Sequence, residues 1–104
     1  MLLVAAVAML VGGCLAPTLP LPPPSKPAVA GPDASGNVEL TGSVQANAEV
    51  YVRNYGSTDI YGQITGGDGA YDITLPAKVG DQLELWYTVG KDQSPSIEFQ
   101  IRAP

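Results

Sequence analysis

The side chains that could carry out catalysis in this chain are serines and lysines, and none has the partner that its chemistry needs. The hydroxyl nucleophiles of the predicted domain are Ser43, Ser57, Ser94 and Ser96. A serine nucleophile needs a base to take its proton, and the chain contains no histidine. Lys78 and Lys91 fall in predicted turns, where the burial that a lysine base requires is rare. An enzyme would therefore need a pair of carboxylates in a concave site, and we expect no enzyme.

Aspartates in the predicted turns are candidate metal ligands, and their spacing does not favour a metal site. Asp68 and Asp72 flank a glycine turn, and other predicted loops hold Asp59, Asp81 and Asp92. Calcium needs several such oxygens at one point, but no run has the spacing of a known calcium loop. Zinc is disfavoured because histidine, its commonest ligand, is absent. We expect these aspartates to form turns, and we expect no metal and no cofactor.

Three aromatic residues are candidates for ligand binding. Trp86 lies between Leu85 and Tyr87 in an alternating run, so it is expected to point away from the core. The same alternation places Tyr51 and Tyr61 on the side of their strands that faces away from the core. Exposed aromatic rings can stack on sugars or anchor a protein partner. The alternative is that such a ring only covers a sheet edge or the tether, or that a bulge turns Trp86 inward.

The first fourteen residues form an apolar run that ends at the only cysteine of the chain. Leu2 to Val11 are all apolar, and ten helical residues reach about 15 Å, half the thickness of the hydrocarbon layer. That length is typical of a signal peptide and too short for a spanning helix. With one cysteine, no disulfide can form within the chain.

The end of this run, Val11-Gly12-Gly13-Cys14, resembles the lipobox of bacterial lipoproteins. The resemblance implies a diacylglycerol on the sulfur of Cys14, cleavage between Gly13 and Cys14, and a lipid anchor in the cell envelope. Leu15 follows the cysteine where an aspartate would favour the inner membrane, so the resemblance favours the outer membrane in a Gram-negative cell. The absence of Lys or Arg before the apolar run departs from the family pattern, and a start placed too far downstream would account for it. The alternative is an ordinary signal peptide over residues 1–13 and an incidental thiol at Cys14.

Proline dominates the next segment. Seven of the ten prolines lie between Ala16 and Pro32. Proline lacks the backbone donor and fixes φ, so this segment is expected to form an extended spacer of about 50 Å. Residues 14–35 are thus predicted to be a tether that lifts the domain off the bilayer.

From residue 36 to residue 104 the pattern has the period of two that half-buried strands show. The predicted strands carry Val38 and Leu40; Ala48, Val50 and Val52; Ile60, Gly62 and Ile64; Tyr71, Ile73 and Leu75; Leu83, Leu85, Tyr87 and Val89; and Ile97, Phe99 and Ile101. Turn residues separate them at intervals of roughly ten residues. The fold class is therefore all-β, a small antiparallel sandwich of six to seven strands.

The motifs of these strands and turns resemble the carboxypeptidase regulatory-like domain and, equally, bacterial immunoglobulin-like repeats. The resemblance rests on Ala48-Glu49-Val50-Tyr51-Val52, on Asp68-Gly69-Ala70-Tyr71 and on the Gly80-Asp81 turn, and it covers residues 36 to 102. It implies a spacer, stalk or accessory module. Such repeats usually occur in tandem and this chain has one copy, which argues against a pure stalk.

Composition limits the class of partner. Ten acidic and five basic residues give a net charge of −5, and the basic residues do not cluster, so nucleic acid is excluded as a partner. We therefore expect a membrane-anchored lipoprotein that presents a non-catalytic module for structural or protein-interaction roles. The alternative is a lipoprotein that binds carbohydrate or peptidoglycan through Trp86 and Tyr51.

Overall fold

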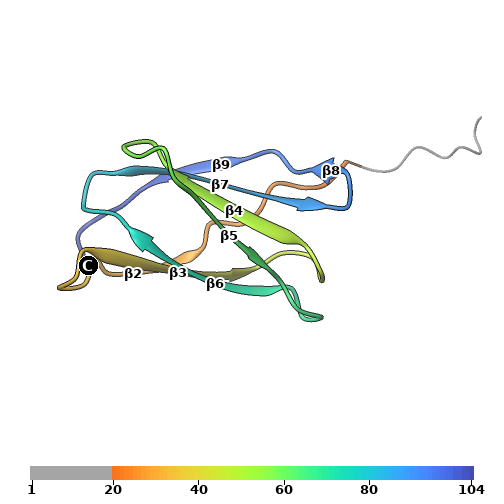
Figure 1. The fold of residues 1–104 in the computed structure, drawn as a ribbon, viewed down its shortest axis with the longest axis horizontal. Helices are drawn as coiled ribbons and strands as arrows, with labels where there is room; N and C mark the ends of the chain where they lie inside the picture. Colours follow the sequence, from red (N-terminus) through yellow and green to blue (C-terminus); the bar gives the residue numbers. More distant parts are fainter. Residues whose placement is uncertain (1–19) are drawn as a thin grey trace, which may run out of the picture.

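A computed structural model of the chain describes residues 20–104, which fold into two antiparallel sheets packed face to face (Figure 1). No helix within these residues is long and apolar enough to cross a membrane. The predicted signal peptide, Cys14 and the first part of the tether lie outside the described residues.

The smaller sheet has three strands in the order β2-β3-β6. They are β2 (Ala28–Ala30), β3 (Asn37–Ser43) and β6 (Ala70–Pro76). In β3 and β6 the side chains alternate between buried and accessible positions, as the period of two predicts.

The larger sheet consists of β4 (Glu49–Asn54), β5 (Ile60–Ile64), β7 (Gln82–Val89), β8 (Asp92–Gln93) and β9 (Ile97–Gln100). Its order is β5-β4-β7, and both β8 and β9 pair with the remaining edge of β7. The two short strands thus share one edge and are separated by Ser94, Pro95 and Ser96.

The core lies between the inner faces of the two sheets. Its buried apolar residues are Val38, Leu40, Ala48, Val50, Val52, Tyr71, Ile73, Leu75, Ala77, Leu83, Leu85, Tyr87, Phe99 and Ile101. Almost all of them are the residues that the alternation assigned to one face of a strand. The prediction of a small antiparallel β-sandwich is confirmed.

The expectation of a free spacer up to residue 35 is wrong for the part that the structure describes. Ala28–Ala30 form strand β2, which pairs with β3. Ahead of it, Pro24 and Pro27 are buried and Leu21 packs against the core. The hydroxyl of Tyr87 donates a hydrogen bond of 2.8 Å to the carbonyl oxygen of Pro22.

This docked segment, residues 21–30, covers the open side of the sandwich between the two sheets (Figure 1). Proline rings bury apolar area without needing a partner for a backbone N–H, which is why a proline-rich segment can serve here. The domain therefore begins near Leu21 and not at residue 36.

Candidate binding site

The outer face of the larger sheet carries the candidate site. We use the name "outer face" for the side chains of this sheet that point away from the core: Ile60, Gly62 and Ile64 of β5, Glu49, Tyr51 and Arg53 of β4, and Glu84, Trp86 and Thr88 of β7. Their neighbours in β4 and β7 alternate with them and are buried.

Two aromatic rings meet at the centre of the outer face. Tyr51 and Trp86 are directly opposite each other in the β4–β7 pair, and their rings stack with centroids 5.7 Å apart and planes 24° apart. On the other side of Tyr51 lies Gly62 of β5. A Cβ atom at Gly62 would lie 3.1 Å from the tyrosine ring, so a larger residue here would have to push the ring aside by a few tenths of an ångström. The resulting row of Gly62, Tyr51 and Trp86 runs across three strands.

Polar groups hold this row on the side of Glu49. One carboxylate oxygen of Glu49 accepts hydrogen bonds from the Tyr51 hydroxyl at 2.8 Å and from the Thr88 hydroxyl at 3.1 Å. The hydrogen bond to Glu49 raises the pKa of Tyr51 above its ordinary value.

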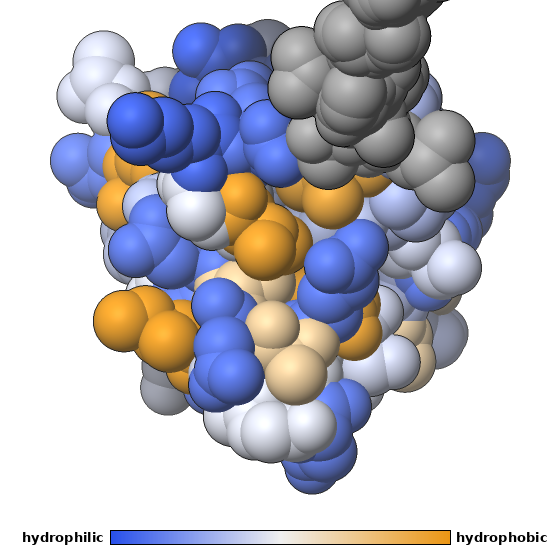
Figure 2. Space-filling model, turned by 90° about the vertical axis from the view of Figure 1, so that its right-hand side faces the viewer, coloured by the Kyte–Doolittle hydropathy of each residue, from blue (hydrophilic) through white to orange (hydrophobic). Residues whose placement is uncertain are grey.

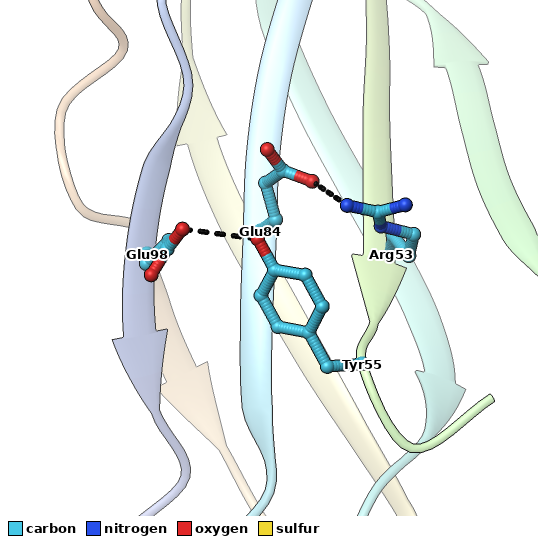
Figure 3. Close-up of polar contacts among 4 residues, drawn as sticks. All are labelled: Arg53, Tyr55, Glu84 and Glu98. Carbon is cyan, nitrogen blue, oxygen red and sulfur yellow. Dashed lines mark hydrogen bonds and ion pairs between the residues drawn. The ribbon is translucent and has the colours of Figure 1, made fainter.

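On the opposite side, Arg53 is held by two neighbours (Figure 3). Its Nη2 atom lies 2.7 Å from a carboxylate oxygen of Glu84, and its guanidinium carbon lies 4.8 Å from the centre of the Tyr55 ring. The Tyr55 hydroxyl in turn donates a 2.9 Å hydrogen bond to Glu98 of β9, which raises the pKa of Tyr55. The Arg53 side chain is 40% exposed, but the Nε atom of the guanidinium is buried and has no hydrogen-bond partner among the described residues.

A β-bulge interrupts the edge strand beside Trp86. Thr88 pairs with Gln93 and Leu85 pairs with Ile97, so two residues of β7, Trp86 and Tyr87, face three residues, 94 to 96. Pro95 has no backbone N–H and cannot donate a hydrogen bond between the strands. Ser94 makes the hydrogen bonds to β7 in place of a regular strand pairing. Ser94 donates its N–H to the carbonyl oxygen of Tyr87, and its hydroxyl oxygen accepts the N–H of Tyr87 at 3.0 Å.

The bulge leaves an open hollow of about 400 Å³ next to the tryptophan. Its lining residues are Arg53, Ile60, Glu84, Trp86, Gln93, Ser94, Pro95 and Ser96. A second hollow of about 290 Å³ lies on the far side of Tyr51, between Glu49 and Ile64. Tyr51 and Trp86 therefore form a ridge with a depression on each side.

The structure places two of the three predicted aromatic residues together. Trp86 and Tyr51 lie on the outer face, as the alternation predicts. The prediction for Tyr61 is wrong: it pairs with buried Val52 and packs against the core. β5 carries apolar residues on both faces, so alternation alone does not orient it, and Ile60 and Ile64 are instead 55% and 69% exposed. The predicted lipidation at Cys14 and cleavage at Gly13 fall outside the described residues.

Sequence reasoning missed the residues of the bulge. Gln93, Pro95 and Ser96 line the hollow, although they fall in a stretch without alternation. The signal that could have found them is Pro95, because a proline inside a strand pattern occurs mainly at sheet edges and bulges.

The carboxylates of the described residues do not gather into a metal site. Within residues 20–104, no group of three or more histidine, cysteine, aspartate or glutamate side chains could hold a metal ion. Asp68 instead accepts the N–H of Ala70, the turn-forming role expected of it. Glu39 of β3 lies opposite Thr74 of β6, and Asp72 lies opposite Thr41, so the two carboxylates are diagonal neighbours. A hydrogen bond with Asp72 raises the pKa of Glu39. Both residues are exposed to water.

Comparisons with known families, curated proteins and solved structures found no match for this chain. The likeness to regulatory-like and immunoglobulin-like domains therefore rests on the sequence motifs alone.

Proposed function

We propose that this protein is a bacterial lipoprotein, held to the cell envelope through a lipid on Cys14, whose β-sandwich works by binding and not by catalysis. The outer face of the larger sheet is its contact surface. The anchor rests on the Val11-Gly12-Gly13-Cys14 motif after an apolar run, and Leu15 favours the outer membrane if the cell is Gram-negative.

The observation that carries the binding role is the stacked pair of Tyr51 and Trp86 on an exposed sheet face. Exposed Ile60 and Ile64 lie on the same face, beside the ridge. The exposed side of the smaller sheet is different, because the exposed positions of β6 are Ala70, Asp72, Thr74 and Pro76, none of them aromatic. Aromatic side chains in the middle of a surface are the usual anchors of binding sites, so the two faces have different roles.

The docked segment sets how far the domain can stand from its anchor. Between Cys14 and Leu21 the chain has seven residue steps, which span at most about 25 Å. The free tether predicted from the sequence would have allowed about twice that distance. The partner of the outer face is therefore expected close to the membrane that carries the lipid.

The end of the domain that faces the anchor supports attachment by lipid. Figure 2 views the molecule from the side where the described chain begins, and apolar side chains there are interrupted by hydrophilic ones. A surface that inserts into a bilayer by itself would need a continuous apolar face. Two or three acyl chains on Cys14 would provide a durable hold.

The exposed carboxylate pair supports a non-catalytic role. Glu39 has a raised pKa, as a general acid would, but water surrounds both Glu39 and Asp72 and favours their charged forms. A glycosidase needs two carboxylates that flank a bound sugar in a concave site.

Photo-crosslinking in intact cells tests the binding role. A photoreactive amino acid at Ile64 would sit on the outer face, and one at Thr74 would sit on the opposite sheet as a matched control. We expect a discrete adduct from position 64 and little or none from position 74. Equal adducts from both positions would show that the outer face is not the contact surface.

A further inference from the structure

The partly exposed indole of Trp86 is stacked on one side and borders the hollow. Tyr51 stacks on it from β4. The other neighbour of β7 is the edge formed by β8 and β9, and there the bulge at residues 94–96 replaces regular pairing and leaves the hollow that Trp86 lines. A ligand in this hollow would therefore meet an aromatic ring backed by a second one.

Hydrogen-bonding groups surround this ring. Arg53 and Glu84 line one part of the hollow, and Gln93 and Ser96 line another. In Arg53, Nη2 bonds to Glu84 and Nε is buried, which leaves Nη1 as the donor for a ligand. The hydrogen bonds found among residues 20–104 leave the side chains of Gln93 and Ser96 unused, and both residues are exposed. Ser94 differs, since its hydroxyl donates to the carbonyl oxygen of Pro95 and is buried.

The charge of the hollow is balanced. The only charged side chains that line it are those of Arg53 and Glu84, which pair with each other. The whole chain carries a net charge of −5 and repels anions at longer range. An uncharged ligand avoids both this repulsion and competition with the ion pair.

From these features we infer that the hollow beside Trp86 binds a neutral hexopyranose unit of a glycan. A pyranose ring has a flat face of C–H groups, which would stack on the indole, and a rim of hydroxyls, which would bond to Arg53, Glu84, Gln93 and Ser96. The volume of about 400 Å³ falls within the range of small-molecule sites. This inference rests on the proposed function, because it names the ligand class of the same outer face.

Titration of the full chain with oligosaccharides tests the inference. The chain has one tryptophan, so all tryptophan fluorescence comes from Trp86, which lines the hollow. The protein would be held in a detergent whose headgroup is not a sugar, since a glycoside detergent would compete. The probes are neutral oligosaccharides of glucose and of N-acetylglucosamine, together with a glucuronic acid oligosaccharide of matched length. We expect a saturable change with at least one neutral probe and weaker binding of the charged one.

Variants locate the site by calorimetry. Ser96→Phe would fill the hollow from an exposed loop position and leave Trp86 in place, and Trp86→Ala would remove the stacking surface. Each is expected to weaken binding about tenfold or more, the usual effect of losing a central aromatic contact. Thr74→Ala on the other sheet is the control and is expected to bind normally. Circular dichroism of each variant confirms that the sheets remain, and Ser96→Phe carries the test if Trp86→Ala fails to fold.

Three outcomes would overturn the inference: no saturable change with any neutral probe, tighter binding of the charged probe, or undiminished binding by Ser96→Phe. The proposed function would survive each of them if crosslinking from position 64 still gave its adduct. Loss of that adduct together with intact sugar binding would instead overturn a contact that extends to position 64 and confine the binding surface to the hollow.

Discussion

Asn54 is a buried polar residue whose side chain makes hydrogen bonds to other parts of the chain. Its side chain is buried, and it joins the end of β4 to two turns. Its Nδ2 donates to a carboxylate oxygen of Asp81 at 2.9 Å, and its Oδ1 accepts the N–H of Gly56 at 2.9 Å. Asn54→Ala is expected to lower the free energy of unfolding by about 1–3 kcal/mol, because it leaves these groups without their partner. Urea denaturation measures this, and an unchanged midpoint would show that water replaces the amide.

The same contact predicts a pH dependence of stability. Hydrogen bonds from Asn54 and from the backbone N–H of Lys78 hold the pKa of Asp81 below its ordinary value. A carboxylate with a lowered pKa in the folded state stabilises the fold above the ordinary pKa, and this contribution is lost as the pH falls through the folded-state pKa. Asp81→Asn should therefore lose more stability at neutral pH than at about pH 3. Asp59→Asn, in an exposed loop, is the control, and equal losses at both pH values would contradict the prediction.

At the level of elements, the proline-rich segment is a structural part of the domain. Leu21, Pro24 and Pro27 face the core, and Pro22 and Pro23 are exposed. Replacing the first three with serine is expected to cost roughly 2 kcal/mol or more of unfolding free energy, because apolar area is no longer buried. Replacing Pro22 and Pro23 with serine is the matched control and should cost much less. A free spacer would make both sets neutral.

The hydroxyl of Tyr87 offers a finer test of the same docking. Tyr87→Phe removes its 2.8 Å hydrogen bond to the carbonyl of Pro22 and leaves the ring in the core. We expect a loss of about 1 kcal/mol, the usual net value of such a bond. Thermal unfolding measures it, and a variant as stable as the parent would show that this bond does not hold the segment.

The elements also show how far the sequence can predict this molecule. Strands with one polar face, such as β6, can be predicted from the alternation alone, because each side chain is favourable on only one face of the sheet. Strand β2 could not be predicted in this way, because Ala28–Ala30 show no alternation of polar and apolar residues and follow prolines. The stack of Tyr51 on Trp86 depends on the register between β4 and β7, and the hollow depends on the extra residue at the bulge. Both are long-range pairings that a local pattern does not encode.

For the whole molecule, we propose a sandwich held near a membrane by a short link. Cys14→Ser removes the only sulfur that could carry a lipid. We expect the variant either to be released in soluble form or to remain as an uncleaved precursor, because acylation supplies the membrane affinity. Detergent-phase partitioning distinguishes it from the parent protein, and unchanged partitioning of the variant would contradict the anchor.

Mass spectrometry of the intact protein purified from membranes tests whether the β-sandwich is held by a lipid. We expect a chain that begins at Cys14 and carries the added mass of a diacylglycerol, with or without a further acyl chain on the new amino terminus. A mature chain with an unmodified thiol at Cys14 would contradict it.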